Sequence, residues 1–589
     1  MKSTLAAKPL HDVLICGGGL AGLTLALQLR RAHPTSDVVV IEPTTRPLPD
    51  ACHKVGESTV ELGAHYLQNV LGLREYLRAR HLLKNGLRFF PGNNLRPIAE
   101  RMEIGPPTLP LVPSYQLDRG RLENDLRGMC EEAGVTLLEG ARVTALELRG
   151  DGPHEVEVEG PEGAARLRGR WLVDATGRRR LLQRQLGLHR DLAHHASAAW
   201  FRVKGRVDVA DLVDKTDEAW HRRDIDHVRY LSTVHLMGRG YWAWLIPLST
   251  GHTSVGVVTD ERIHPLASYS KPEGAMAFLR ANEPALAAHL EGYEQQDFRC
   301  VREYCYGSRR VFSAQRWACV GEAGVFIDPL YSPGSDYIGM MNCYAAEMIR
   351  RDLEGAHDPG YIELMDRVFH RICDVSTENF RDGFVVLGKA RAFAAKLYWD
   401  NLVYWALLCP HIIHGVYRDE ALVRDAFVPI ASEYAALNIA VQRVFRVWGE
   451  HSPGAHDRSH VYLPQAPSML ANLHGVLGSA RTPEEAIEAL RQNLAYAREA
   501  AGEVFLRAVR DIGPKHAVEL GAQLQGADVV INYDARRCEN DGSVGRARTK
   551  ALPFIAREFE RSFGRVEHGQ APPMPELLRM SGVADRAAL

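Results

Sequence analysis

The stretch HDVLICGGGLAGLTLALQLRRAHPTSDVVVIEP, residues 11–43, decides the fold of this 589-residue chain. Residues 13–16 are a short apolar run, residues 20–31 carry apolar side chains at helical spacing, and residues 37–41 form a valine-rich run that ends at Glu42. A glycine turn separates the first run from the helical segment. This order predicts a strand, a helix and a second strand, the β–α–β unit of a parallel sheet.

The glycine turn has the spacing G-x-G-x-x-G at Gly17, Gly19 and Gly22. The first glycine lets the chain turn, the second lets the backbone approach a pyrophosphate, and the third lets helix and strand pack closely. The start of the helix directs free N–H groups at the phosphates, and Glu42 is placed to accept a ribose hydroxyl. The turn therefore predicts a dinucleotide site, against the alternative of a glycine turn without a ligand. The predicted contact residues are Gly17, Gly18, Gly19, Leu20, Ala21, Gly22 and Glu42.

Composition limits the class of protein. Apolar residues make up 46% of the chain and the formal net charge is −2, so the overall charge does not favour nucleic acid or an anionic membrane. The ten cysteines form no C-x-x-C pair, which favours reduced thiols over disulfides or a zinc site. Residues 402–413 are the most apolar stretch outside the first strand, but they are too short to span a bilayer and contain Pro410. Since no secretory apolar segment precedes residue 11, we expect a soluble, cytoplasmic protein without a bound metal.

The pattern of apolar residues divides the chain into regions. Residues 198–258 alternate as strands of an antiparallel sheet do, residues 316–349 return to strand, turn and helix, and the pattern after about residue 360 is helical. We expect an α/β Rossmann domain with an inserted antiparallel β-sheet domain and a long α-helical C-terminal region. The predicted boundaries are 1–190 and 300–355 for the nucleotide domain, 191–299 for the β-sheet substrate domain, and 356–589 for the helical domain.

The helical region begins one of its helices with a capping box at Thr482 and Glu485, with Pro483 at the first helical position. It is also rich in aromatic side chains. These either form helical core or line a substrate pocket, and the sequence leaves both alternatives open: Phe384, Phe393, Tyr398, Trp399, Tyr404, Trp405 and Tyr417.

Two later segments favour FAD over NAD. LVDATGRRR (residues 172–180) and CVGEAGVFIDP (residues 319–329) are similar to the second and third fingerprints of FAD-binding oxygenases. In that resemblance, Asp328 approaches the ribityl side of the flavin and Arg119 also approaches the FAD, while Glu322 replaces the usual aspartate. We find no second nucleotide fingerprint, so reducing power is expected from a separate protein.

Four motifs together resemble flavin-dependent halogenases of the tryptophan-halogenase-like superfamily. They are the glycine turn, the segment Gly56-Glu57-Ser58, the W-x-W-x-I-P of residues 242–247, and the F-x-x-P-x-x-S-x-G of residues 326–334. They span roughly residues 10–350. The resemblance implies a fold like those of glutathione reductase and p-hydroxybenzoate hydroxylase. It adds Glu57 and Gly334 to the predicted FAD contacts, and Ser332 to the predicted catalytic residues.

Trp242 and Trp244 lie at strand spacing and point to the same face. In similar enzymes this pair occupies the space between flavin and substrate, so that only a small oxidised halogen species passes. A tryptophan pair that only forms sheet core is the alternative.

The resemblance assigns the catalytic lysine to Lys84, which precedes the aromatic Phe89 by five residues, and not to Arg88. A lysine amine can hydrogen-bond hypohalous acid or be halogenated, whereas a guanidinium stays protonated. Burial would lower the pKa of Lys84 and raise its neutral fraction. An exposed cation at the end of a helix is the alternative.

One motif departs from the tryptophan-specific members. They carry Glu-Ser-Thr-Gly where this chain has Tyr331-Ser332-Pro333-Gly334. The missing glutamate argues for a phenol-like substrate over free tryptophan. Pro333 has no N–H to offer a halide, while the amides of Gly334 and Ser335 remain available as an anion nest.

The implied activity is FADH2-dependent halogenation of a small electron-rich aromatic, using O2 and chloride or bromide. The implied partners are a separate flavin reductase, a substrate that is free or tethered to a carrier protein, and, as an open alternative, a second copy in a homodimer. A flavin monooxygenase or oxidoreductase that no longer uses halide is the first rival. A non-catalytic flavin-binding subunit that docks carrier proteins is the second.

Overall fold

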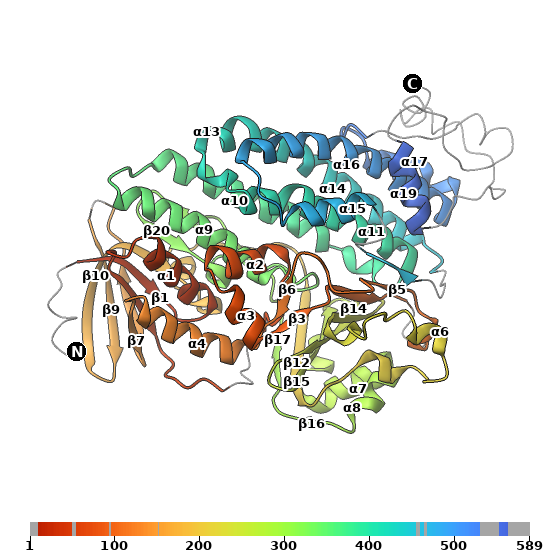
Figure 1. Cartoon of the computed structure of the whole chain (residues 1–589), viewed down its shortest axis with the longest axis horizontal. Coiled ribbons are helices and arrows are strands. Elements are labelled where there is room, and N and C mark those ends of the chain that lie inside the picture. Colours follow the sequence, from red (N-terminus) through yellow and green to blue (C-terminus); the bar gives the residue numbers. More distant parts are fainter. Residues whose placement is uncertain are drawn as a thin grey trace.

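The computed structural model describes residues 10–49, 55–92, 96–150, 152–454, 460–463, 468–529 and 553–563. Its first sheet has the strand order β19-β20-β10-β1-β2-β7, and β8 and β9 extend it beside β10 (Figure 1). The central strands pair in parallel. Their bounds are β1 His11–Cys16, β2 Val38–Glu42, β7 Thr136–Glu139, β8 Arg142–Glu147, β9 His154–Gly160, β10 Gly163–Asp174, β19 Phe312–Ser313 and β20 Trp317–Cys319.

The predicted β–α–β unit is confirmed, because α1 (Leu20–Ala32) connects β1 to the parallel neighbour β2. α1 packs against α4 (Arg119–Glu132) and α9 (Gly334–Leu353). Residues 38–41 of β2 are all buried, as expected for a parallel strand covered on both faces.

The second sheet is mainly antiparallel and has the order β16-β12-β15-β14-β13-β4-β5-β21, with β17 also beside β12. Its bounds are β4 Leu87–Phe90, β5 Glu103–Ile104, β12 Ala196–Lys204, β13 Thr233–Gly238, β14 Tyr241–Pro247, β15 His252–Asp260, β16 Glu294–Gln295, β17 Arg299–Val301 and β21 His460–Val461. β4, β5 and β21 come from outside residues 191–299. Strands of two residues, such as β5 and β21, are too short to show a periodic pattern in the sequence.

Strand β14 faces two cores. Trp242, Trp244 and Ile246 belong to the core shared with the first sheet and the helices. Tyr241, Ala243 and Leu245 pack in a separate core with α7 (Pro272–Asn282) and α8 (Pro284–Leu290). The two-residue period of a strand therefore directs both tryptophans toward the interior between the sheets.

The C-terminal helices lie along one side of both sheets (Figure 1). They include α10 Pro359–Phe380, α11 Ala390–Val403, α12 Cys409–Ile413, α14 Val428–His451, α15 Ser468–Val476, α16 Pro483–Ile512, α17 Ala517–Gln523 and α19 Pro553–Phe563, and a π-helical turn, η9, covers Tyr404–Leu408. The predicted capping box begins α16. No helix in the described ranges is long and apolar enough to cross a bilayer.

Shorter elements connect these parts, and two of them contain Glu61 and Lys84. They are α2 Glu61–His65, α3 Arg74–Arg80, α5 Leu181–Gln185, α6 Glu218–His221, α13 Glu420–Leu422 and the two-stranded pairs β3 (Leu82–Lys84) with β6 (Ser114–Gln116) and β11 (His189–Arg190) with β18 (Gly307–Ser308). The eight cysteines in the described part of the chain are free thiols, whereas Cys52 and Cys538 lie outside it.

Candidate active site

The three glycines of the turn differ in what surrounds them. Gly17 has φ +112°, and a Cβ there would lie 2.3 Å from the carbonyl oxygen of Ala175. A Cβ on Gly22 would lie 2.0 Å from the carbonyl oxygen of Gly17, so helix and strand pack closely. A Cβ on Gly19 would meet no atom within 4 Å, which leaves its backbone open to a ligand.

This open space belongs to a cavity of about 640 Å³, the first cavity. Glu42 lies on its border, and its carboxylate accepts the N–H groups of Gly18 (2.7 Å) and Thr44 (2.9 Å). Of the predicted site residues, those that line the first cavity are Gly17, Gly19, Leu20, Ala21, Glu42, Glu57, Arg119, Trp242, Trp244, Asp328, Ser332, Gly334 and Ser335. Gly18, Gly22 and Lys84 are absent from its described lining. A cradle of bare backbone beside an acidic side chain fits a dinucleotide.

Three charged residues of the first cavity hold its walls in place. Arg119 donates to the carbonyl oxygen of Val55 (2.7 Å). Glu57 accepts two hydrogen bonds from the buried Arg202, and burial raises the pKa of the Glu57 carboxyl although Arg202 opposes the shift. Asp328 accepts hydrogen bonds from His194 Nε2 and Tyr304, each at 2.7 Å.

The tryptophan pair borders the first cavity. The rings of Trp242 and Trp244 lie 5.7 Å apart at an interplanar angle of 44°. Trp244 donates its indole N–H to Ser254 Oγ (3.1 Å), and its ring lies over Gly256, where a Cβ would be 2.2 Å from a ring carbon. Trp200 on β12 lines the same cavity, although the sequence did not single it out.

A second cavity, of about 130 Å³, adjoins the first and is mostly apolar. An engineered protein cavity of about 150 Å³ holds one benzene molecule, so the second cavity has the size of a single ring. Pro333 and Tyr337 line both cavities. Tyr404 and Trp405 of the helical region line the second, whereas Phe393 and Trp399 are buried in the core, so both alternatives for the tail aromatics occur.

A row of rings runs from the lining of the second cavity to the lining of the first. Phe89, which lines the second cavity, stacks on His235, which lines the first, with centroids 4.5 Å apart. His235 in turn lies 5.3 Å from Trp242. The His235 Nδ1–H donates to the carbonyl oxygen of Arg88, and burial lowers the pKa of the imidazole to about 3, so the ring is neutral.

Lys84 is a buried residue of strand β3 and not an exposed cation at a helix end. Its side chain is 1% exposed, and Nζ donates to the carbonyl oxygen of Thr59 (2.7 Å). Thr59 lies between Ser58, which lines the first cavity, and Val60, which lines the second. Burial lowers the pKa of Lys84 to about 7, against the opposing fields of Glu61 and Asp336. The amine therefore lies behind the boundary of the two cavities, and it lines neither of them among the described residues.

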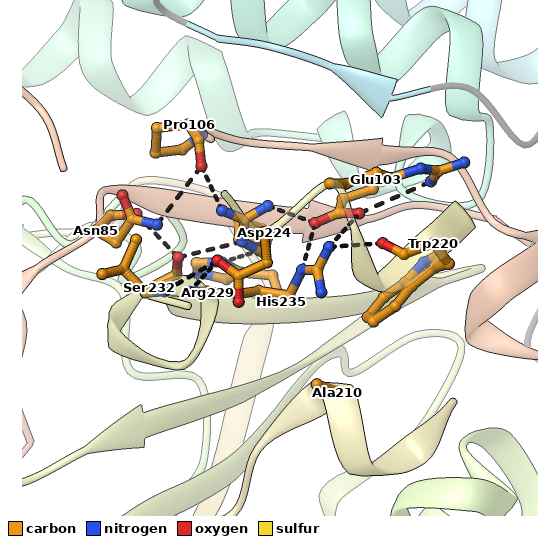
Figure 2. Close-up of polar contacts among 12 residues, drawn as sticks. Asn85, Glu103, Pro106, Ala210, Trp220, Asp224, Arg229, Ser232 and His235 are labelled. Atoms are coloured by element: carbon orange, nitrogen blue, oxygen red, sulfur yellow. Dashed lines mark hydrogen bonds and ion pairs between the residues drawn. The ribbon is translucent and has the colours of Figure 1, made fainter. Parts of the chain in front are cut away.

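Arg88 has a different position. Its guanidinium donates to Glu103 and to the carbonyl oxygen of Pro106, and Arg229, in the 3-10 helical turn Arg229–Leu231, donates to the same Glu103. Figure 2 shows this buried cluster, in which Arg229 donates both to Glu103 and to the carbonyl oxygen of Trp220. Since Arg88 is fully engaged there, it supports the turn that follows Lys84 and takes no part in either cavity.

The segment after Tyr331 turns sharply into α9. Ser332 has φ +59° and its hydroxyl donates to Ser58 Oγ (3.1 Å). Because Gly334 and Ser335 begin the helix, their N–H groups have no intrahelical partner. The Ser335 hydroxyl is buried without a hydrogen-bond partner in the structure. An orphaned hydroxyl at the positive end of a 20-residue helix fits a bound anion.

Several site residues were missed by sequence reasoning. His235, Trp200, Asp336 and Tyr404 belong to no motif quoted above, and Tyr404 was considered only as one of many tail aromatics. The sequence offers one signal for Asp336, its position two residues after the motif that ends at Gly334. Glu61, another acidic residue of the second cavity, likewise follows the segment Gly56-Glu57-Ser58 by three residues.

The comparisons with known proteins agree with this geometry. A family model described as an FAD binding domain matches residues 11–266. The flavin-dependent halogenase chlA of Dictyostelium discoideum is 27% identical over 448 residues, which cover 71% of this chain and 73% of that protein. The 1H-pyrrole-2-carbonyl-[peptidyl-carrier protein] chlorinase of Pseudomonas fluorescens is 25% identical over 345 residues, which cover 55% of this chain and 72% of that protein.

Among solved structures, halogenase PltM in complex with phloroglucinol and FAD has a similar fold. Its TM-score is 0.59 at 16% identity, with 87% of this chain and 99% of that chain covered. The resemblance that the motifs predicted is thus confirmed: residues 11–266 match an FAD binding domain, curated relatives include flavin-dependent halogenases, and the fold is similar to that of a halogenase structure.

Proposed function

We propose that the chain is an FADH2-dependent halogenase that uses O2 and chloride or bromide to halogenate a small, electron-rich, phenol-like aromatic. One observation carries the proposal. A dinucleotide cavity and a ring-sized cavity adjoin across a row of aromatic rings, and a buried amine with a pKa near 7 lies at their boundary.

The residues of the first cavity fit FAD. Gly17 and Gly19 would face the pyrophosphate, Glu42 a ribose, and Arg119 and Asp328 the remainder of the cofactor. Bound in reduced form, FAD together with O2 supplies the oxidising equivalents that convert halide into hypohalous acid. No second glycine-rich β–α–β unit is evident in the sequence, which favours reduction by a separate flavin reductase.

The halide would bind at the start of α9. The N–H groups of Gly334 and Ser335 and the orphaned Ser335 hydroxyl offer three donors there. Pro333 is the residue before the helix, so its missing N–H removes none of these donors.

The aromatic row controls access. In this proposal the rings of Trp242, His235 and Phe89 keep an organic ring out of the first cavity and let a small neutral oxidant pass. Their close contacts support this, because neighbouring ring centroids lie 5.3 and 4.5 Å apart. Lys84 would then hold the oxidant by a hydrogen bond, or carry the halogen as a haloamine. At a pKa of about 7 the amine is available in both protonation states near neutral pH.

A reduced-FAD assay tests the proposal. The enzyme is loaded with anaerobically reduced FAD and then mixed with O2, bromide or chloride, and a panel of phenols, indoles and pyrroles, and the products are weighed by mass spectrometry. We expect products with the mass of an added halogen, in the highest yield from a phenol. A hydroxylated product without halogen would support the monooxygenase rival, and absence of O2 uptake would support the non-catalytic one.

The carrier-bound pyrrole of one relative and the phloroglucinol complex of the PltM structure leave the form of the substrate open. The same panel, presented both free and as carrier-protein thioesters, separates these forms.

A further inference from the structure

The described residues around the second cavity carry negative charge and no permanent positive charge. Its lining includes the carboxyl groups of Glu61, Asp336 and Asp400 and no lysine or arginine. His474 is the one basic side chain of that lining, and it is paired with Glu61 (3.2 Å). Two amines lie behind this lining: Lys84 donates to the Thr59 carbonyl, and Lys396 donates to Asp400. Such a chamber disfavours an anionic ligand.

Asp336 differs from the other carboxyl groups because it is held at a fixed place by neutral donors. It lies in the first turn of α9, and Oδ1 accepts the N–H of Gly63 (2.7 Å) while Oδ2 accepts the hydroxyl of Tyr404 (2.6 Å). The Tyr404 oxygen accepts the N–H of Leu62 (3.2 Å) in turn. Each carboxylate oxygen has a further lone pair, so Asp336 can still accept a hydrogen bond from a ligand.

Glu61 and Asp400 already have other side-chain partners, and that of Glu61 is His474 (3.2 Å). Asp400 accepts Lys396 Nζ (2.9 Å), the Tyr331 hydroxyl (2.8 Å) and Gln442 Nε2 (2.7 Å). Asp336 differs from Asp400 in that its own hydrogen bonds come from a neutral N–H and a neutral hydroxyl rather than from an ammonium group.

From this geometry we infer that Asp336, oriented by Tyr404, accepts a hydrogen bond from a ring hydroxyl of a neutral, polyhydroxylated aromatic, and that the second cavity rejects aromatics bearing a carboxylate. The inference rests on the proposed function, whose substrate class it narrows.

The chemistry gives this contact a use. In electrophilic halogenation a carbon–halogen bond forms, the halogen–oxygen bond of hypohalous acid breaks, and the ring proton leaves with the hydroxide as water. After the halogen has added and before the ring proton leaves, the ring is electron-poor and Asp336 holds the proton of the ring hydroxyl. Asp336 returns this proton to the hydroxyl oxygen when the ring proton has left and the ring is aromatic again. A positive charge on the ring is thereby neutralised by a group that touches the substrate.

The protonation of Asp336 is consistent with such a role. Burial raises the pKa of its carboxyl to about 7, while the Tyr404 hydroxyl, the Gly63 N–H and the charge of Lys84 oppose this shift. The ionisable groups that face it are Glu61, Lys84, Tyr404 and Cys409. Since the carboxylate is the acceptor, binding of a hydroxylated ring should strengthen as the pH rises through about 7.

Binding measured without turnover tests the inference separately from the proposed function. FAD-loaded enzyme without halide is titrated by calorimetry with phloroglucinol, 1,3,5-trimethoxybenzene and 2,4,6-trihydroxybenzoate. We expect the methyl ether and the benzoate to bind at least about tenfold more weakly than phloroglucinol, since the ether has no hydroxyl to donate and the benzoate carries a charge of the same sign as the lining. Equal affinity of the benzoate would overturn the exclusion of anions.

Variants identify the acceptor. Asp336→Asn should weaken phloroglucinol binding about tenfold or more at pH 8 and remove the rise near pH 7. Tyr404→Phe should move that rise to higher pH, because it removes a donor that lowers the pKa of Asp336. Glu294→Gln, on the exposed strand β16, removes one charge outside both cavity linings and should leave phloroglucinol affinity within about twofold.

Stoichiometric FAD binding and an unchanged melting temperature show that each variant is folded. Wild-type affinity and pH dependence in folded Asp336→Asn would refute the inference. Phloroglucinol binding that depends on Asp336, without any halogenated product from the wild type, would instead refute the proposed function alone.

Discussion

Burial controls what single residues of this protein can do. Lys84 and Arg88 lie four residues apart and are both buried, yet one donates to a lone backbone carbonyl and the other to a carboxylate shared with a second arginine. An amine without an anionic hydrogen-bond partner is more easily neutralised than a paired guanidinium.

Lys84→Ala should lower halogenation about 100-fold or more while leaving O2 uptake by the reduced enzyme within about twofold. The reason is that Lys84 would act on the oxidant after it has formed in the first cavity. Product and O2 are measured in the same samples. Lys389→Ala is the matched control, since its Nζ also donates to a backbone carbonyl, that of Ser452 (2.7 Å). Halogenation that survives in Lys84→Ala would refute the assignment.

Glu103→Gln should destabilise the fold by about 3–5 kcal/mol, because two buried arginines, Arg88 and Arg229, would lose their carboxylate. Chemical denaturation followed by circular dichroism measures the change. The pKa of Glu103 is lowered in the folded state by these arginines, so its stabilisation is present above the unfolded pKa and is lost as the pH falls. The exposed Glu294→Gln on β16 should change stability by less than about 0.5 kcal/mol, and an equal effect of both variants would contradict this account.

At the scale of elements, the pairing of β14 with β15 positions Trp244 beside Trp242 of the aromatic row. Trp244 pairs with Gly256, and the glycine leaves the room that the indole occupies. The alternation of β14 was readable from the sequence, whereas the need for a glycine opposite Trp244 follows only from the strand register.

Gly256→Ala should displace Trp244, destabilise the protein by about 1–3 kcal/mol and lower the yield of halogenated product per O2 consumed. The yield falls because a displaced Trp244 would shift its neighbour Trp242, 5.7 Å away, out of the aromatic row. Gly292→Ala is the control, since its added Cβ would lie 3.7 Å from the nearest atom. An unchanged yield in folded Gly256→Ala would show that the position of Trp244 does not matter.

At the scale of the whole molecule, the second cavity is built from three distant parts of the chain. Glu61 comes from the nucleotide region, Phe89 from a strand of the second sheet, and Tyr404 from the helical region. The C-terminal helices therefore form part of the site as well as covering the sheets (Figure 1).

Dependence on a separate reductase is the prediction for the whole molecule. We expect that NADH or NADPH alone leaves the FAD of the purified protein oxidised, and that adding a flavin reductase starts product formation. Flavin absorbance near 450 nm reports reduction directly. Rapid reduction by NADH or NADPH without the reductase would show that the chain binds the nicotinamide itself.

The sequence by itself determined the β–α–β unit, the tight turn at Gly17, Gly19 and Gly22 inside it, and the common face of Trp242 and Trp244. These features depend on backbone conformation and periodicity within a few residues, so local spacing encodes them. Only the tertiary structure decided that Asp336 meets Tyr404, that His235 joins the aromatic row, and that β4, β5 and β21 complete the second sheet. Those contacts join segments far apart in the chain, and their partners are chosen by packing and burial, which leave no periodic signal in the sequence.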